Sequence, residues 1–149
     1  MNRPLLIALL LLIGASRLCG YADFNPWSHN TSAVDAKGIR HDAHSYKGNA
    51  PWLVDRVGGP APEYPIEERR MRHQGRAIVR LTLDLKTGHV IKASLLKSSG
   101  YPTLDRCAVA AFSRWTWRPG KWKEIDLPVT FEIGNPQSPP RGSVRLPRP

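Results

Sequence analysis

The stretch from Lys97 to Gly120, KSSGYPTLDRCAVAAFSRWTWRPG, constrains the fold of this chain more than any other segment. Pro102 or Thr103 opens an expected helix, and the conformational restriction on Arg118, which precedes a proline, ends it. Small residues in its apolar stripe would let the helix lie close on a sheet. The stripe consists of Leu104, Cys107, Ala108, Ala111, Phe112 and Trp115, with Trp117 expected at the edge of the core.

An alternating pattern before this helix predicts the sheet that it covers. Residues 76–85, RAIVRLTLDL, place an apolar side chain at every second position, which indicates a strand with one buried face. Gly88 supplies the positive φ of a hairpin turn. The return strand, residues 89–97, is less regular, and its spacing predicts a bulge near residues 91–92.

A final strand and a short first helix complete the expected domain. Residues 125–133 alternate again, but Pro128 cannot donate to a ladder, so we expect this strand at a sheet edge. Acidic residues followed by basic ones after Pro65 predict a short helix that Gly75 ends. The expected fold is therefore α+β: a small antiparallel three-stranded sheet with helices on one face, in the order helix, strand, strand, helix, strand.

The two ends of the chain differ from this region. A basic residue and a short apolar run within residues 1–22 predict a secretory signal peptide cleaved after Ala22, because the run is too short to span a bilayer. Residues 23–55 lack a sustained period and are expected to form a mostly disordered linker. The ordered domain is expected at residues 56–134, and residues 135–149 form a basic, Pro-rich tail expected to be disordered.

Charge and compartment limit the partners. The chain has 22 Lys and Arg residues against 12 Asp and Glu residues, a formal net charge of +10, which favours anionic partners. Export argues against nucleic acid and predicts a periplasmic or cell-envelope location, with a tether to the inner membrane if the signal stays uncleaved. Cleavage would leave Cys107 as the single cysteine, which predicts no internal disulfide and a buried, inert thiol.

Catalytic and metal sites are not expected. Ser98 or Ser99 with His89 and Asp105 would be the candidate catalytic set, but the chain has no G-x-S-x-G motif, and an SSG sequence after a strand suits a turn. The histidines of HDAH, residues 41–44, are interpreted as solvated rather than as metal ligands. The sequence therefore predicts a protein that is not an enzyme and that needs no cofactor or metal.

The motifs of residues 61–133 resemble the TonB C-terminal domain family. They follow one another in the family's order: EYP at residues 63–65, two glycines at Gly75 and Gly88, SSG, LD, the small-residue helix, RWTWRPG and LPVTFEI. This resemblance implies a binding module that couples an inner-membrane, proton-driven motor to outer-membrane receptors importing iron chelates, vitamin B12 or similar nutrients.

The resemblance also implies where the partner binds. In the family, a short receptor segment called the TonB box adds a strand to the last strand of the domain, and the segment before Tyr-Pro lies nearby. An exposed strand edge suits this mode, because main-chain hydrogen bonds tolerate varied partner sequences. The corresponding partner-binding residues here are Pro62, Glu63, Tyr64, Leu127, Pro128, Val129, Thr130, Phe131, Glu132 and Ile133.

The chain departs from the family pattern in its N-terminal region and in its first helix. The family's full-length transducers carry an uncleaved anchor and a long Pro-rich spacer, and they often have apolar residues where this chain has Glu68 and His73. The alternative function is a periplasmic scaffold that binds peptidoglycan or another envelope protein through the same fold. Contact with the motor complex and a homodimer formed by swapping an edge are also open.

Overall fold

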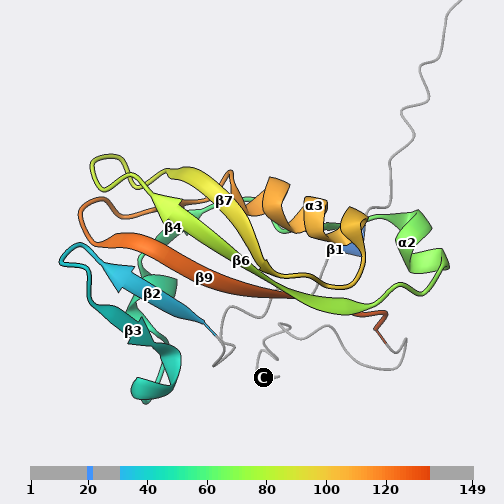
Figure 1. Ribbon diagram of the computed structural model, residues 1–149, viewed down its shortest axis with the longest axis horizontal. Helices are drawn as coiled ribbons and strands as arrows, with labels where there is room; N and C mark the ends of the chain where they lie inside the picture. The colour runs from blue at the N-terminus through green and yellow to red at the C-terminus, as the bar shows by residue number, and fades with distance from the viewer. Residues whose placement is uncertain (1–19, 22–30, 135–149) are drawn as a thin grey trace, which may run out of the picture.

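A computed structural model describes residues 20, 21 and 31–134 of the chain. Its main feature is a five-stranded antiparallel sheet in the order β3-β2-β9-β6-β7 (Figure 1). The structure confirms the α+β class, but the expectation of three strands was wrong. The two additional strands, β2 (Ser32–Asp35) and β3 (Arg40–Asp42), come from the segment that we expected to be a linker.

The remaining elements complete the domain. The other strands of the main sheet are β6 (Gly75–Leu83), β7 (Val90–Lys97) and β9 (Trp122–Phe131). Two small ladders pair β1 (Gly20–Tyr21) with β5 (Glu63–Tyr64) and β4 (Arg56–Gly58) with β8 (Thr116–Trp117). The helices are α1 (Pro51–Val54), α2 (Ile66–Arg70) and α3 (Pro102–Phe112), with a 3₁₀ turn, η1 (Ala43–Ser45).

The N-terminal segment is ordered where the composition suggested a linker. Trp52 is fully buried, and its Nε1 donates to the hydroxyl of Thr31 at 3.0 Å. The Thr31 hydroxyl in turn donates to the backbone carbonyl oxygen of Asp126 in β9 at 2.6 Å. The expected disorder of residues 31–55 is thus contradicted. The burial of tryptophan and the strand pairing with β9 stabilise the segment, and neither contact leaves a periodic pattern within the segment itself.

The final strand lies inside the sheet. The presence of Pro128 led us to expect β9 at the edge of the sheet, and this expectation was wrong for the strand as a whole. β9 pairs with β6 along one side and with β2 along part of the other. The pairing with β2 involves residues 122–126 and stops before Pro128. The missing N–H of Pro128 is tolerated because no described strand pairs with β9 at that position on that side.

The hairpin has the predicted bulge and turn glycine. The bulge is confirmed, since Thr82 pairs with Lys92 and Leu83 with Val90, which leaves Ile91 as the additional residue. Gly88 has the expected positive φ, at 75°. The helix from Pro102 ends at Phe112, earlier than predicted, and Trp117 lies in β8.

The first helix is also shorter than predicted. It ends at Arg70, and the left-handed residue after it is Arg72, with φ 57°, rather than Gly75. Gly75 instead begins β6, where its backbone lies against the carbonyl oxygen of Ser99, so a Cβ would collide with that oxygen. Gly75 therefore allows two segments to approach each other closely, and it does not end the helix.

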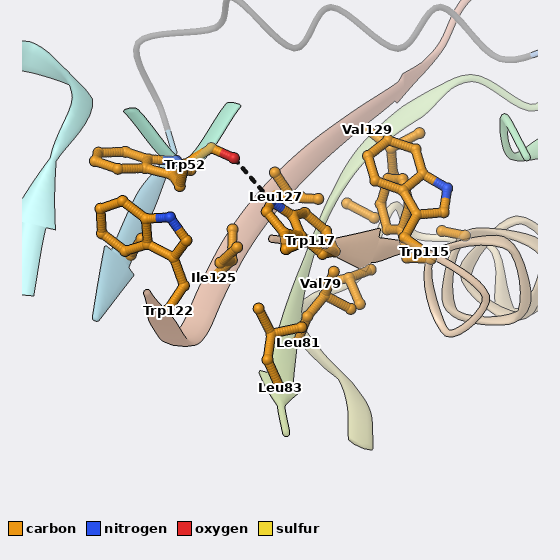
Figure 2. Packing of buried hydrophobic residues seen from close by; sticks show 14 of the residues in the cluster. Trp52, Val79, Leu81, Leu83, Trp115, Trp117, Trp122, Ile125, Leu127 and Val129 are labelled. Atoms are coloured by element: carbon orange, nitrogen blue, oxygen red, sulfur yellow. Dashed lines mark hydrogen bonds between the residues drawn. The ribbon is translucent and has the colours of Figure 1, made fainter. Parts of the chain in front are cut away.

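The core lies between α3 and one face of the sheet. Figure 1 shows these two layers, with α3 lying over the sheet. Alternate residues of β6 and β9 point to this face, and Figure 2 shows them packed beneath a group of tryptophans. Each residue of the core cluster has an exposed fraction below a tenth. The central members are Val79, Leu81, Ile125, Leu127, Val129, Leu104, Ala108, Phe112, Trp52, Trp115, Trp117 and Trp122.

Candidate strand-addition site

The second half of β9 forms an edge beside the end of β2. Its residues Leu127–Phe131 pair with Val79–Gly75 of β6 on one side. On the other side, the pairing with β2 ends at Asp126, and no described strand continues it. We call the stretch from Leu127 to Ile133 the open edge. It contains the seven C-terminal residues of the predicted partner-binding set.

Two hydrogen bonds establish which backbone groups face outward at the open edge. The carbonyl oxygen of Asp126 accepts from Thr31 and therefore points to the β2 side, whereas the N–H of Ile133 donates to Gln74 Oε1 at 2.9 Å on the β6 side. Because backbone groups alternate along a strand, those of Pro128, Thr130 and Glu132 point away from β6. Pro128 offers a carbonyl oxygen there, and Thr130 and Glu132 offer both an N–H and a carbonyl oxygen.

The side chains of the open edge divide between the two faces of the sheet. Leu127, Val129 and Phe131 are buried in the core, at 0%, 1% and 0% exposure, so a partner could reach their backbone but not their side chains. Thr130 is half-buried and Glu132 is exposed, whereas Pro128 is buried on the opposite face from the core residues. Ile133 lies after the end of β9 and is 36% exposed.

The segment before α2 lies at the C-terminal end of the open edge. The rings of Tyr64 and Phe131 meet edge to face with centroids 5.4 Å apart. The Tyr64 hydroxyl donates to the carbonyl oxygen of His73 at 2.7 Å, which fixes the ring, and burial raises its pKa. Of the neighbouring residues, Pro62 is buried and Glu63 is exposed. The structure therefore places Tyr64 beside Phe131 of the open edge.

A cluster of charges on the other face of the sheet ties β2 and β3 to β9. Asp126 accepts from Arg80 Nε at 2.8 Å and Arg80 Nη2 at 2.9 Å, and Arg40 Nη1 lies at 3.2 Å. Burial opposes ionisation of Asp126, but the bonds from Arg80, with those from Ser32 and the charge of Arg40, hold its pKa below the ordinary value. No local pattern in the sequence indicates this cluster, because its members come from four strands.

The pair that distinguished the first helix from the family pattern forms a contact. His73 Nδ1 lies 2.8 Å from Glu68 Oε2, and the His73 ring stacks on Tyr101 with centroids 4.2 Å apart. The contact joins α2 to the start of α3 close to Tyr64. A polar pair and a ring stack therefore connect the two helices.

The candidate catalytic residues do not assemble. Ser98 and Ser99 donate their hydroxyls to Asp105, at 2.5 and 2.7 Å, and Asp105 also accepts the Ser99 N–H at 2.8 Å. These bonds hold the SSG turn against the first turn of α3, and they keep the pKa of Asp105 low in spite of its burial. His89 precedes β7 and Ser98 follows it, so the two residues lie at opposite ends of that strand.

The histidine at the start of HDAH and the cysteine of α3 have defined surroundings in the described part of the chain. His41 contacts Asp35 and Tyr46 through its two ring nitrogens, each at 3.1 Å. Across residues 20, 21 and 31–134, no three His, Cys, Asp or Glu side chains gather as a metal-binding group. Cys107 is partly buried, and burial raises the pKa of its thiol.

Comparison with known proteins identifies the domain that carries the open edge. The family described as Gram-negative bacterial TonB protein C-terminal matches residues 60–136. The chain belongs to this TonB C-terminal family. The matched region includes β5, α2, β6, β7, α3, β8 and β9, and it begins after β2 and β3 of the main sheet.

Relatives of the TonB C-terminal domain agree with this assignment. Protein tonB2 of Pseudomonas aeruginosa is 32% identical over 80 residues, which are 50% of this chain and 29% of the relative. Protein TonB of Neisseria meningitidis serogroup C is 31% identical over 102 residues, 68% of this chain and 36% of the relative. This chain thus spans about a third of the length of these relatives.

Two further comparisons concern the rest of the molecule. No solved structure matches the chain. Among the residues that the structure describes, no helix has the length and apolar character needed to cross a membrane. The predicted signal peptide falls on residues 1–22, of which the structure describes only Gly20 and Tyr21, and the predicted tail, residues 135–149, lies outside the described residues.

Proposed function

We propose that this TonB C-terminal domain acts as a periplasmic binding module that engages TonB-dependent outer-membrane receptors by strand addition at the open edge. It would take part in energy-coupled import of iron chelates, vitamin B12 or similar nutrients. It would do so by binding rather than by catalysis. The observation that supports this proposal most is the end of the β2 pairing at Asp126, which leaves the outward backbone groups of Pro128, Thr130 and Glu132 for a partner strand.

The surroundings of the open edge support the same function. The side chains of Leu127, Val129 and Phe131 anchor β9 in the core, so its edge is held by a rigid element. A rigid edge loses little conformational freedom when a strand is added, which favours binding. Tyr64 and its neighbours Pro62 and Glu63 lie at the end of this edge, where a receptor segment that extends past β9 would meet them.

The outward direction of the Thr130 N–H gives a direct test. Thr130→Pro removes that N–H, whereas Thr130→Ala keeps the backbone intact. Pro128 has the same outward direction and is tolerated in the native strand, so Thr130→Pro should preserve the ladder to β6. We expect Thr130→Ala to bind a TonB-box peptide within about twofold of the parent, and Thr130→Pro to lose at least about tenfold in affinity, because it forfeits a main-chain hydrogen bond and restricts the adjacent backbone.

Calorimetric titration of the full chain measures both affinities, and circular dichroism checks that each variant is folded. Val129→Pro is the matched control, since its N–H points to β6 and its loss should unfold the strand. Equal affinity of the two folded Thr130 variants would contradict strand addition at this edge. Binding to isolated peptidoglycan that is insensitive to Thr130→Pro, with no receptor bound, would favour the scaffold alternative.

The location is tested separately. If the first 22 residues are a signal peptide, mass spectrometry of the cell-envelope fraction should find a mature N-terminus near Asp23. Recovery of intact Met1 in the membrane pellet would contradict cleavage and would favour a tethered transducer in contact with the inner-membrane motor. Neither result affects the strand-addition test.

A further inference from the structure

An exposed patch of apolar and cationic side chains lies where α1 continues into β4. Val54 and Val57 are 59% and 68% exposed, and Arg56 between them is also exposed. β4 pairs with β8, and the N–H of Arg118 donates to the carbonyl oxygen of Asp55 at 2.9 Å, so Arg118 lies beside this segment. We call Val54, Arg56, Val57 and Arg118 the α1–β4 patch.

The acidic residue of this region is already compensated. Residues 51–60 and 113–123 contain a single carboxylate, that of Asp55. Asp55 is buried, and it accepts from Lys121 Nζ at 2.8 Å and from Trp122 Nε1 at 3.0 Å. These bonds hold the backbone of the patch on the domain, and they leave the exposed cations around it without a competing negative charge.

The guanidinium groups at the patch have no ionic partner. In the described part of the chain, no carboxylate forms an ion pair with Arg56, Arg114 or Arg118. The Cζ of Arg56 lies 4.5 Å from the centroid of the Trp115 ring, and a guanidinium stacked on an indole keeps the N–H groups along its edge for an anion. Arg114 directly precedes Trp115 in the chain, so it adds a third cation to this region.

Exposed valines next to unpaired guanidinium groups suit one kind of partner. Arginine binds phosphate through two parallel N–H groups, and valine side chains are stabilised where they leave water. The surface of a bilayer that contains anionic phospholipids offers both, because phosphates lie in the headgroup layer and acyl chains lie beneath it. A hydrated polysaccharide offers anionic groups but no apolar layer for the valines.

The α1–β4 patch and the open edge lie toward opposite ends of β9. Lys121, which holds Asp55 of the patch segment, directly precedes β9, and Trp122 is the first residue of that strand. The open edge begins at Leu127 and continues past Phe131, the last residue of the strand. A domain that contacts a bilayer through the patch therefore keeps the open edge accessible to a partner strand.

We propose that the α1–β4 patch is a docking surface for a membrane that contains anionic phospholipids. The two valines enter the boundary between headgroups and acyl chains, and Arg56, Arg118 and the neighbouring Arg114 bind lipid phosphates. The attachment is reversible, because two small apolar side chains and three cations bind far more weakly than an inserted helix. This membrane contact is additional to receptor binding and does not depend on it.

Vesicle flotation of the full chain, as recovered from the cell envelope, measures the contribution of charge. The probes are vesicles of phosphatidylglycerol and phosphatidylcholine in equal parts, and vesicles of phosphatidylcholine alone. The double variant Arg56→Glu, Arg118→Glu should bind the anionic vesicles at least about tenfold more weakly than the parent. The matched control, Lys92→Glu with Lys97→Glu, makes the same change of net charge on exposed residues of β7 and should lose less than about threefold.

A second pair of variants measures the apolar contribution. Val57→Ser should weaken binding to the anionic vesicles about threefold, because it removes an apolar side chain from the contact. Ile91→Ser is the matched control, since Ile91 is 67% exposed on β7, and it should leave binding within about 1.5-fold of the parent. Equal losses in the two variants would overturn the proposal.

NMR identifies the face that meets the bilayer, whatever the N-terminal apolar run contributes to binding. Small bicelles of the same two phospholipids carry a lipid with a gadolinium chelate, which broadens the signals of nearby nuclei. The amide signals of Val54 and Val57 should lose more intensity than that of Ile91. Equal loss at the three positions, or greater loss at Ile91, would overturn the proposal.

The remaining outcomes are also decisive once circular dichroism has shown that the variants are folded. If the double variant does not fold, Arg118→Glu alone should still lose about threefold, because its side chain has no ion pair among the described residues. Equal losses in the double variant and its β7 control would overturn the proposal. So would sensitivity of peptidoglycan binding to the double variant when no vesicle is bound, which would assign the patch to the cell wall. A TonB-box peptide should bind the folded double variant within about twofold of the parent, so the proposed function is judged separately.

Discussion

The indole Nε1 of Trp117 donates a hydrogen bond of 2.7 Å to the backbone carbonyl oxygen of Trp52, a residue 65 positions earlier in the chain. Both side chains are buried, and Figure 2 shows the bond inside the tryptophan group of the core. The bond links the segment before the family match to a residue within it. The segment that contains β2 and β3 is therefore part of the folded domain, and the end of β2 sets where the open edge begins.

Removal of Trp52 tests this connection. Trp52→Ala should destabilise the domain by about 3–5 kcal/mol, the usual cost of truncating a buried tryptophan. Thermal or urea unfolding measures the loss. Val54→Ala is the matched control on the same helix, because Val54 is 59% exposed, and it should change stability by less than about 0.5 kcal/mol. Equal stability of Trp52→Ala and the parent would mean that the N-terminal segment does not contribute to the fold.

Trp115 gives a second core test. It is 1% exposed, its ring meets Phe112 with centroids 4.8 Å apart, and its Nε1 donates to the carbonyl oxygen of Pro60 at 2.6 Å. Trp115→Ala should lower the free energy of unfolding by about 3–5 kcal/mol. A variant that melted like the parent but failed to bind a TonB-box peptide would show a ligand contact in place of a core position.

The charge cluster at Asp126 predicts a dependence of stability on pH. The pKa of Asp126 is lower in the folded protein than its unfolded value of about 3.9, so its contribution is fully present above that value and is lost as the pH falls below it. Asp126→Asn should cost about 1.5–3 kcal/mol at pH 7, since it weakens charge-assisted bonds.

Melting temperatures of parent and Asp126→Asn between pH 7 and pH 2 measure this dependence. The difference between the two proteins should shrink as the pH falls below about 4, because the unfolded parent then binds a proton at Asp126 that the folded parent does not yet bind, and it should be smallest below the folded pKa, where both states of the parent are neutral at this position. A difference that stays constant down to pH 2 would show that ionisation of Asp126 does not stabilise the fold.

Gly75 provides a test of close approach. Gly75→Ala places a Cβ against the carbonyl oxygen of Ser99 and should destabilise the domain by about 1–3 kcal/mol, a typical cost of overpacking. Gly48→Ala is the control, since no heavy atom lies within 4 Å of the added Cβ. Chemical denaturation of both variants compares them, and equal midpoints would contradict the steric role of Gly75.

Local patterns predicted the elements whose information lies within a few residues. Alternation along residues 76–85 predicted β6, and the uneven spacing after Gly88 predicted the bulge at Ile91. Helix ends were predicted less accurately than strands. The observed helix α3 stops at Phe112, before the tryptophans that the predicted helix included. The apolar pattern of the helix continues to Trp115 and Trp117, but both residues lie beyond the end of α3 and are buried through contacts with other segments.

The candidate site shows the same division. The order of motifs from residue 63 to residue 133 was enough to indicate the TonB C-terminal family and to point to the last strand. Pro128 has no N–H, and it correctly indicated a position where β9 has no partner strand on its outer side. It did not show that β9 as a whole lies inside the sheet. The extent of the open edge gave no separate signal, because it depends on which strands are neighbours.

The sequence by itself determined the alternation of buried and outward residues, the hairpin with its bulge, the α+β class and the family. These features depend on period, turn chemistry and local order, which can be read along the chain. The tertiary structure alone decided that residues 31–55 join the domain, that β2 covers β9 only as far as Asp126, and that Arg40, Arg80 and Asp126 meet. Such outcomes arise from pairing and burial between segments far apart in sequence, whose free energy appears only when the segments are brought together.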